Sequence, residues 1–298
     1  MSFNQVRYFL EVARAASIRE ASERLNIAPS ALSRQIQNLE EDLGMPLFER
    51  RPRGMVLTPA GEVYSRYAQA IALETDRVRT ELEELRGLRR GRVRVYTVEG
   101  IVSDVLTRLI AEFNEKLPGI SFKLVTTGTD DVVAAVREGH ADLGISFNAQ
   151  PDAAVRFVRR IRDPLIALVH PDHPLAGRGS VRFAEILTYR LGVPEPGFGI
   201  RRLIDDECRR LGASLQPALE TNSIEALRGF ARSGAGVTLM SSQSSTRELA
   251  QGLVRNVGLD EPALLRSTLD VGVLAGRRLP SAVTEFLAAL DRIFAVRG

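Results

Sequence analysis

The hydrophobic pattern of this 298-residue chain changes once, near Arg92. Before that point, apolar residues recur mainly at intervals of three and four, as on amphipathic helices. After it, short apolar runs typical of buried strands alternate with helical stretches. A chain with this change is expected to build two cores of different class, a mainly helical N-terminal one and an α/β C-terminal one.

Composition and charge exclude several classes of protein. Hydrophobic residues make up 44% of the chain and charged residues 26%, as in ordinary globular proteins. No apolar run approaches the roughly 20 residues of a membrane span, and the first 20 residues lack a signal-peptide core. The single cysteine, Cys208, excludes an internal disulfide and fits a reducing compartment. We therefore expect a cytoplasmic protein without a membrane partner.

The first 44 residues predict three short helices. Ser2 and Gln5 form one capping box, and Ser17 and Glu20 form a second. Pro29 suits the first position of a third helix, which Gly44 ends. A short helix, a tight turn and a second helix are typical of a helix-turn-helix. The third helix places apolar residues on one stripe, predicted to be core: Leu32, Ile36, Leu39 and Leu43.

The opposite face of the third helix carries groups that bind phosphates and base edges, namely Ser30, Ser33, Arg34 and Gln37. Residues 45–58 then read as two short strands around a basic turn, a wing that would touch the DNA backbone through Arg50, Arg51 and Arg53. The alternative for both features is an ordinary exposed surface, which any small helical pair or basic turn presents.

A fourth helix is predicted to begin at Pro59, after the capping residue Thr58. It carries a seam with alternating spacings of four and three, formed by Tyr64, Ala68, Ile71, Thr75, Val78, Leu82 and Leu85. Such a heptad seam needs a partner helix, most simply the same helix of a second subunit. The alternative is packing on the chain's own C-terminal domain. Residues 86–91, with two glycines and three arginines, read as a hinge.

The C-terminal region alternates strands and helices. Strands are expected at residues 93–98, 121–126, 143–147, 165–169, 191–194, 237–240 and 268–274. Helices are expected at 103–117, 130–138, 200–211, 223–232 and 281–294. The order of the first elements implies parallel strands with crossover helices. In such sheets ligands bind beyond the carboxyl ends of the strands, near helix N-termini.

Eight residues at these strand ends are candidates for an effector cleft: Thr97, Glu99, Gly100, Thr127, Phe147, Phe198, Gly199 and Thr221. The alternative for each is ordinary turn and cap chemistry. Glu99 would repel an anion, so we expect the effector to offer it a hydrogen-bond donor or a positive group. The competing interpretation leaves Glu99 in solvent or paired with an arginine.

The sequence carries no nucleophile elbow, P-loop or zinc helix, so no enzyme activity, cofactor or metal is expected. His170 and His173 have a spacing suggestive of metal, but a surface turn explains them better than a site with two ligands. Two rival classes are a solute-binding module without DNA function and an enzyme with an appended helix-turn-helix. The recognition helix and the missing signal peptide argue against the first rival, and the missing catalytic constellation against the second.

Residues 3–66 resemble the DNA-binding domain of LysR-type transcription regulators. The matching stretches are FNQVRYFLEVARAASIREASERLN and SALSRQIQNLEEDLGMPLFERRPRGMVLTPAG. LPGISFKLVTTGTDDVVAAVREGHADLGIS, PGFGIRRL and TNSIEALRGFARSGAGVTLM resemble the effector-binding domain of the same family. Many members have a Ser-Gln pair where this chain has Ala28-Pro29, so one usual base contact is expected to be missing or replaced.

The resemblance implies an N-terminal winged helix-turn-helix rich in α-helix and a C-terminal two-lobed α/β domain similar to periplasmic binding proteins. The expected boundaries are 1–58 for DNA binding, 59–90 for the linker helix and hinge, and 91–298 for effector binding. Lobe I would comprise 91–162 and 267–298, and lobe II 163–266. Expected partners are double-stranded DNA, a small-molecule effector of unknown identity, a second subunit bound through the linker helix, a further dimer in a tetramer, and RNA polymerase.

Overall fold

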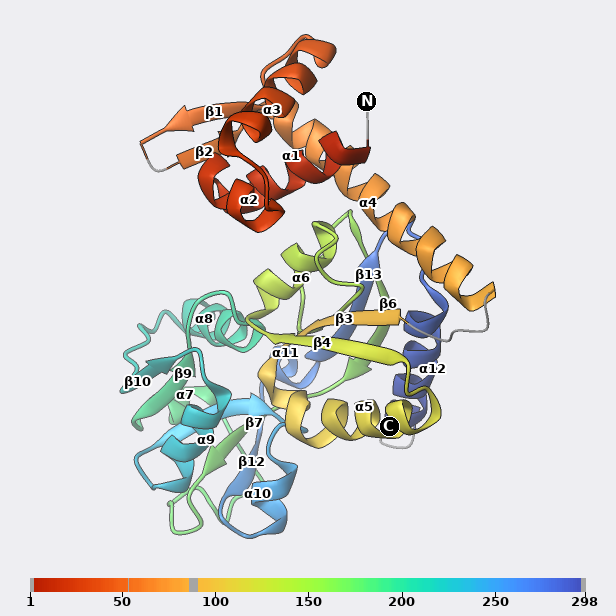
Figure 1. Cartoon of the computed structure of the whole chain (residues 1–298). Coiled ribbons are helices and arrows are strands. Elements are labelled where there is room, and N and C mark those ends of the chain that lie inside the picture. The colour runs from red at the N-terminus through yellow and green to blue at the C-terminus, as the bar shows by residue number, and fades with distance from the viewer. Residues whose placement is uncertain (1–2, 53, 86–90, 296–298) are drawn as a thin grey trace. The chain divides into compact units, whose positions relative to one another are not determined.

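The computed structural model describes residues 3–52, 54–85 and 91–295. It divides into two compact units, Met1–Arg86 and Gly87–Gly298, each with its own core (Figure 1). Among the helices of the described residues, none is long and apolar enough to cross a bilayer.

Unit 1 contains four helices and a β-hairpin within its described residues. The elements are α1 (Phe3–Ala15), α2 (Ile18–Leu25), α3 (Pro29–Leu43), β1 (Phe48–Arg51), β2 (Gly54–Leu57) and α4 (Pro59–Leu85). The ring of Phe9 lies 5.0 Å from that of Phe48 and 4.7 Å from that of Tyr64. One buried aromatic side chain therefore joins α1 to the hairpin and to α4.

The predicted starts and ends of the short helices are largely confirmed. The Ser17 hydroxyl accepts a hydrogen bond from the Glu20 N–H (3.3 Å), and Gly44 ends α3 in the left-handed conformation. The capping box at Ser2 lies outside the described residues. The prediction that Leu43 is core is wrong, since this side chain is 37% exposed. Leu43 lies on the last turn of α3, beyond the core to which Leu32, Ile36 and Leu39 contribute.

The interpretation of α4 as one continuous seam for a partner is also wrong in its first half. Tyr64 and Ala68 are buried in the core of unit 1 itself. Further along α4, Val78 and Leu82 are 43% and 53% exposed. Heptad spacing identifies a buried stripe but does not say which surface covers it, and here α1 covers the first turns of α4.

Lobe I of unit 2 is built on a five-stranded sheet of order β4-β3-β5-β13-β6. Its strands are β3 (Gly91–Thr97), β4 (Ile120–Thr126), β5 (Leu143–Phe147), β6 (Val155–Arg162) and β13 (Thr268–Leu274). Its helical segments are η1 (Glu99–Ile101), η2 (Val102–Leu106), α5 (Thr107–Lys116), α6 (Thr129–Arg137) and α12 (Ser281–Ala295). β3 is parallel to β4 and β5, as predicted, whereas β13 runs antiparallel to β5 and β6. Figure 1 shows α5 beside α12. The ring of Phe113 on α5 lies 5.6 Å from that of Phe286 on α12, and α6 contacts β5 and β13.

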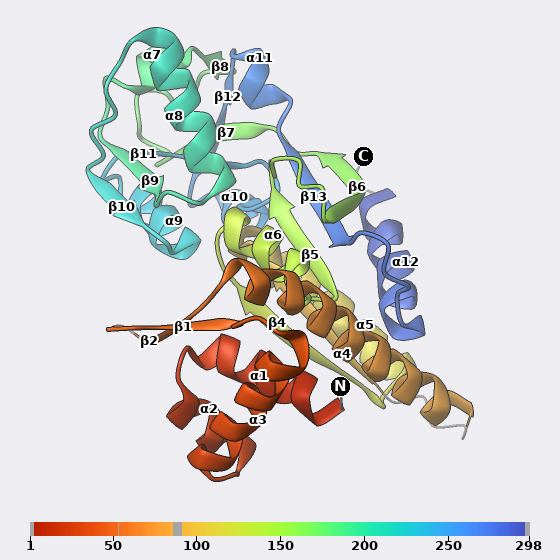
Figure 2. The same ribbon diagram turned by 90° about the horizontal axis from the view of Figure 1, so that it is seen from above.

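Lobe II is built on a six-stranded sheet of order β10-β9-β11-β7-β12-β8. Its strands are β7 (Leu165–Val169), β8 (Ser180–Val181), β9 (Leu191–Pro194), β10 (Leu219–Thr221), β11 (Val237–Ser241) and β12 (Arg255–Leu259). Its helices are α7 (Phe183–Ile186), α8 (Gly199–Leu211), α9 (Ile224–Arg232), α10 (Thr246–Ala250) and α11 (Pro262–Leu265). Figure 2 shows α8 and α9 beside the strands of this sheet.

The chain passes between the lobes twice, after β6 and before β13, and the two passages are tied together. The Asp163 N–H donates to the Ser267 carbonyl (2.9 Å), and the Ser267 hydroxyl donates to the Asp163 carbonyl (2.8 Å). Both residues are fully buried. This pair of hydrogen bonds joins the two crossings where the lobes meet.

Candidate DNA interface and effector cleft

The outer face of α3 carries polar side chains with no internal partner among the described residues. Ser30, Arg34 and Gln37 are exposed and Ser33 is half-buried. No hydrogen bond or ion pair joins these four to the rest of the described chain. At the helix start, Ala28 provides no side-chain cap and Pro29 occupies the first turn. Uncapped N–H groups at a helix N-terminus are suited to bind a phosphate.

The hairpin that follows α3 is held by a carboxylate that sequence reasoning missed. Glu40 Oε1 accepts hydrogen bonds from the N–H groups of Leu47 (2.7 Å) and Phe48 (3.1 Å). At the other end of the hairpin, the Met55 N–H donates to the Ala16 carbonyl (2.7 Å). The signal for Glu40 was its place directly after the core residue Leu39, where a side chain reaches the segment leaving the helix.

The basic residues of the hairpin are placed on β1. Arg50 and Arg51 are exposed, and Arg51 pairs with Glu49 at 3.0 Å. Arg53 lies outside the described residues.

The last position of the L-T-P-A-G motif is Gly61, at the start of α4. A Cβ at this position would lie 2.0 Å from the Leu47 carbonyl oxygen. The close approach of α4 to the hairpin therefore needs glycine.

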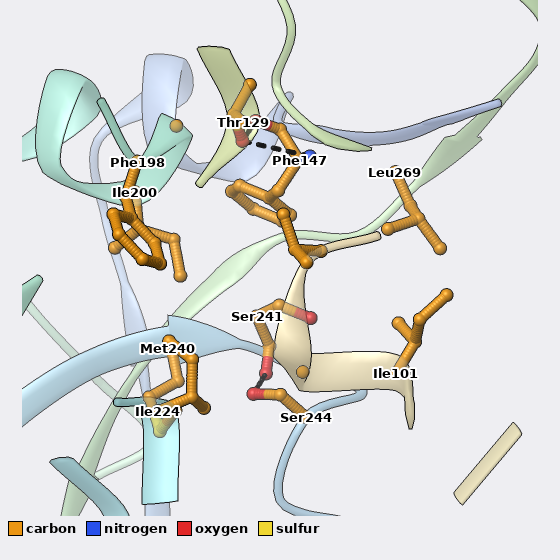
Figure 3. Close-up of a pocket in the computed structure, with 13 residues that line it drawn as sticks. Ile101, Thr129, Phe147, Phe198, Ile200, Ile224, Met240, Ser241, Ser244 and Leu269 are labelled. Carbon is orange, nitrogen blue, oxygen red and sulfur yellow. Dashed lines mark hydrogen bonds between the residues drawn. The ribbon is translucent and has the colours of Figure 1, made fainter. Parts of the chain in front are cut away.

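A small cavity lies between the lobes of unit 2 (Figure 3). Its volume is about 30 Å³, enough for a water molecule or two but far below the roughly 300 Å³ of a small-molecule site. Four of the eight predicted cleft residues line it: Gly100, Phe147, Phe198 and Gly199. The other lining residues are Val98, Ile101, Thr129, Ile200, Ile224, Met240, Ser241, Ser244 and Leu269. The cavity is therefore mostly apolar, with three hydroxyl groups.

Three predicted cleft residues have local partners instead. The buried Thr97 hydroxyl donates to the Val98 carbonyl (3.1 Å), and the Thr127 hydroxyl donates to Asp131 (2.8 Å). The Thr221 hydroxyl accepts from the Ser223 N–H (3.1 Å). These bonds are turn and cap contacts, the alternative that the sequence left open, and none of the three lines the cavity.

The loop after β11 brings Ser241 and Ser244 to the cavity, and sequence reasoning missed it. The Ser244 hydroxyl donates to the Ser241 carbonyl (2.8 Å; Figure 3), and the hydroxyls of Ser241 and Ser242 donate to the carboxylate of Asp163. Burial raises the pKa of Asp163, and these hydrogen bonds do not compensate for it. The run Ser-Ser-Gln-Ser-Ser at the end of a strand could have indicated a polar loop at the cleft. Its position there depends on hydrogen bonds to Asp163, which is far away in the sequence.

Glu99 contacts the opposite lobe. Its Oε2 accepts the Ile224 N–H at 2.7 Å, and its Oε1 accepts the Glu225 N–H at 3.3 Å. Both donors belong to the first turn of α9. Glu99 is thus neither turned to solvent nor paired with an arginine.

The two lobes approach each other backbone to backbone. A Cβ at Gly199 would lie 1.8 Å from the Phe147 carbonyl oxygen, and one at Gly128 would lie 3.2 Å from the Gly197 carbonyl oxygen. The Asp130 N–H donates to the Gly197 carbonyl (3.1 Å). The cleft is closed in this structure, and glycines permit the closure.

The histidine pair fits a surface turn. His170 Nδ1 accepts from the Asp172 N–H and His173 Nδ1 accepts from the Leu175 N–H, each at 3.2 Å. Burial lowers the pKa of His173. Within the part of the chain that the structure describes, no group of three or more His, Cys, Asp or Glu could hold a metal ion.

Comparison with known proteins identifies the family. Residues 3–62 match the bacterial regulatory helix-turn-helix of the lysR family, and residues 86–295 match the LysR substrate binding domain. The chain therefore belongs to the LysR family of transcription regulators. It has a helix-turn-helix DNA-binding domain and a two-lobed α/β effector-binding domain, which confirms the fold class and the class of function predicted from the sequence.

The relatives are named as transcription regulators and not as enzymes. The RuBisCO operon transcriptional regulator of Allochromatium vinosum is 30% identical over 84% of this chain and 82% of its own length. Two solved structures share the fold. A full-length OxyR variant from Pseudomonas aeruginosa covers 98% of this chain and 95% of its own (TM-score 0.75, 21% identity). Full-length CbnR, in complex with its target DNA, covers 98% and 99% (TM-score 0.61, 20% identity).

Proposed function

We propose that this regulator reads its operator through the exposed face of α3 and senses its effector in the cleft between the lobes of unit 2. The observation that carries the proposal is the set of polar groups on α3 that have no partner in the described residues. Polar groups on a helix face that are hydrogen-bonded to nothing within the protein are available to base edges and phosphates at no internal cost.

The proposed roles divide by chemistry. Arg34 and Gln37 have side chains long enough to reach base edges, and Ser30 and Ser33 can bind either a base or a phosphate. Arg50, Arg51 and Arg53 bind the DNA backbone next to the site. The domains that carry out these steps are 1–58 for DNA binding, 59–90 for the connection and 91–298 for sensing.

The test compares two arginines on DNA from upstream of the chain's own gene. Replacing Arg34 by Ala should weaken binding to the preferred sequence by roughly 1–3 kcal/mol and relax discrimination at one base pair. Replacing Arg50 by Ala should weaken binding to all sequences alike and reduce the salt dependence by about one ion. Arg66, an exposed arginine of α4, serves as a control. If the full-length protein shows no salt-sensitive preference for any duplex fragment, the proposal fails.

We further propose that the chain dimerises through the exposed part of α4. Val63, Tyr67, Val78 and Leu82 are large apolar side chains that are 43–60% exposed. Two recognition helices are needed to read two half-sites one helical turn apart. Replacing Val78 and Leu82 by Gln should shift sedimentation toward monomer and lower DNA affinity.

Pairing of dimers into tetramers and contact with RNA polymerase are further expectations for the assembled regulator on its promoter.

The effector is proposed to enter the cleft by separating the lobes. The cavity of about 30 Å³ is too small for a metabolite, so binding needs opening about the two crossings that Asp163 and Ser267 join. A thermal-shift screen of anionic, zwitterionic and cationic metabolites on the full chain tests this step. A true effector should lose its stabilising effect when Phe147 is replaced by Ala.

A further inference from the structure

We propose that Glu99 is an internal latch that holds the effector cleft closed in the absence of a ligand. This inference rests on the proposed role of the cleft in sensing. It goes beyond that role by assigning the closed state to one carboxylate of lobe I, seated on the N-terminus of α9 in lobe II.

The geometry of the contact is that of a ligand at a helix start. The first N–H groups of an α-helix have no partner within the helix and carry partial positive charge. In α9 the Ile224 and Glu225 N–H groups donate to the two carboxylate oxygens of Glu99, at 2.7 and 3.3 Å. The next N–H, of Ala226, donates to the Ser223 hydroxyl (3.2 Å). Glu99 therefore completes the capping of a helix that belongs to the other lobe.

Two other polar contacts cross the cleft between Asp130 and lobe II, and each is expected to contribute less than the bonds of Glu99. The Asp130 N–H to Gly197 carbonyl bond joins two neutral groups. Arg202 pairs with Asp130 at 3.1 Å, but the Asp130 side chain is 56% exposed, and ion pairs at such exposure contribute little. The bonds of Glu99 have a charged acceptor, and hydrogen bonds to charged groups are about twice as strong as neutral ones.

The position of Glu99 couples the latch to the cavity. Glu99 directly precedes the lining residue Gly100, and its partner Ile224 also lines the cavity. A Cβ at Gly100 would lie 3.1 Å from the Cβ of Ser244 in lobe II. When the carboxylate leaves α9, the same short segment of lobe I is released from the wall of the cavity. An effector larger than the present cavity can enter only after this release, so Glu99 sets the free energy of opening.

The test measures opening by the reactivity of a thiol placed inside the cleft. Ser244 is 2% exposed and covered by the backbone of lobe I at Gly100. In the full chain carrying Ser244→Cys, alkylation at position 244 by iodoacetamide proceeds through the open state. Its rate is then proportional to the small open population, which makes it sensitive even if the cleft is almost always closed.

The native Cys208 provides an internal control in the same lobe. It is 4% exposed on the buried face of α8, within the core, so its alkylation requires unfolding rather than opening of the cleft. Mass spectrometry of the two cysteine-containing peptides gives both rates in one experiment. Glu195→Gln is the matched control variant, because it removes one exposed carboxylate near the cleft whose side chain has no partner among the described residues.

Glu99→Ala should raise the alkylation rate at position 244 about tenfold, the effect expected for a hydrogen-bonded charge, and leave that of Cys208 unchanged. Glu99→Gln, which keeps the shape of the side chain, should give a smaller increase, and Glu195→Gln none. An unchanged rate at position 244 in both Glu99 variants would overturn the latch. Equal acceleration at both cysteines would overturn it too, because Glu99 would then support the fold rather than the closure. Neither DNA nor effector is used, so failure here leaves the proposed function standing.

Discussion

On α3, the side chains proposed to read DNA have no partner among the described residues, whereas the hydroxyl groups that line the effector cavity are already hydrogen-bonded. Arg34 and Gln37 of α3 are exposed and free of internal bonds among those residues, while Glu99 and Ser244 are both hydrogen-bonded within unit 2. A surface of the first kind can bind DNA without first breaking a bond. A site of the second kind must exchange internal bonds for ligand bonds, so binding is coupled to a change of conformation.

The largest effect on stability is expected for a carboxylate of unit 2 that is both buried and hydrogen-bonded to two arginines. Asp142 is almost fully buried at the amino end of β5 and accepts hydrogen bonds from Arg94 (2.7 and 3.1 Å) and Arg277 (2.8 Å). Asp142→Ala removes the buried carboxylate that these two arginines share and should lower the free energy of unfolding by about 3–5 kcal/mol. Chemical denaturation of unit 2 measures it. Asp172→Ala, with a side chain 92% exposed, is the control and should change stability by less than about 0.5 kcal/mol. Similar losses in both variants would contradict the contrast.

The second prediction concerns the close backbone contact between the lobes at Gly199, which a larger side chain would disturb. Gly199→Ala places a Cβ against the Phe147 carbonyl, which belongs to a rigid strand. We expect a cost to the closed state of about 1–3 kcal/mol and faster alkylation at position 244 in the Ser244→Cys background. Gly177→Ala is the matched control, because nothing lies within 4 Å of a Cβ at that position. If Gly199→Ala leaves alkylation at the wild-type rate, the two lobes are not held by this contact.

The third prediction concerns Glu40, whose carboxylate accepts hydrogen bonds from the hairpin next to α3. Glu40→Gln weakens the two N–H bonds that hold the hairpin to α3 and should destabilise unit 1 by about 1–2 kcal/mol. Operator affinity should fall with it, because the arginines of β1 lose their fixed place. Glu41→Gln, at the exposed neighbouring position, should leave both quantities unchanged. Equal behaviour of the two variants in urea unfolding and DNA binding would show that Glu40 does not position the hairpin.

The sequence predicted the parts of the fold that local patterns specify. The strands at 143–147, 165–169, 191–194 and 268–274 coincide with β5, β7, β9 and β13. β6 was missed because its run of four arginines in eight residues hides the alternation of a strand. It lies at the edge of the sheet, where charged side chains are common.

The candidate sites divide along the same line. The exposed face of α3 follows from helical periodicity, so the exposure of Ser30, Arg34 and Gln37 could be predicted from the sequence alone. The cleft depends on which loops meet across two lobes. Ser241 and Ser244 reach the cavity only because Asp163, about 80 residues earlier, holds their loop. The partner of Glu99 is 125 residues away, and no local pattern contains that information.

The smallest expected effect is on the pH dependence of stability, to which the buried carboxylates of Asp163 and Asp142 contribute in opposite directions. The pKa of Asp163 is raised because burial outweighs the hydrogen bonds it receives. Burial alone would also raise the pKa of Asp142, but hydrogen bonds from Arg94 and the charges of Arg94 and Arg277 lower it instead. For Asp163 the stabilising contribution is fully present below the unfolded value of about 3.9 and is lost as pH rises through the raised folded pKa. For Asp142 the contribution is present above about 3.9 and is lost as pH falls through the lowered folded pKa.

Asp163→Asn should therefore remove a loss of stability that the wild-type protein suffers as pH rises above about 4. Each unit of pKa difference is worth about 1.4 kcal/mol, so the slope of stability against pH reports the raised pKa of Asp163 directly. Urea unfolding of the wild-type protein and the variants from pH 3 to pH 8 measures it, and a constant offset between two proteins does not matter because the prediction concerns only the slope. Asp142→Asn should change the slope in the opposite direction and only below about pH 4. If the free energies of unfolding of the wild-type protein and Asp163→Asn ran parallel with pH, the Asp163 carboxylate would titrate as it does in the unfolded chain. Its burial beneath the cleft would then not destabilise the protein at neutral pH.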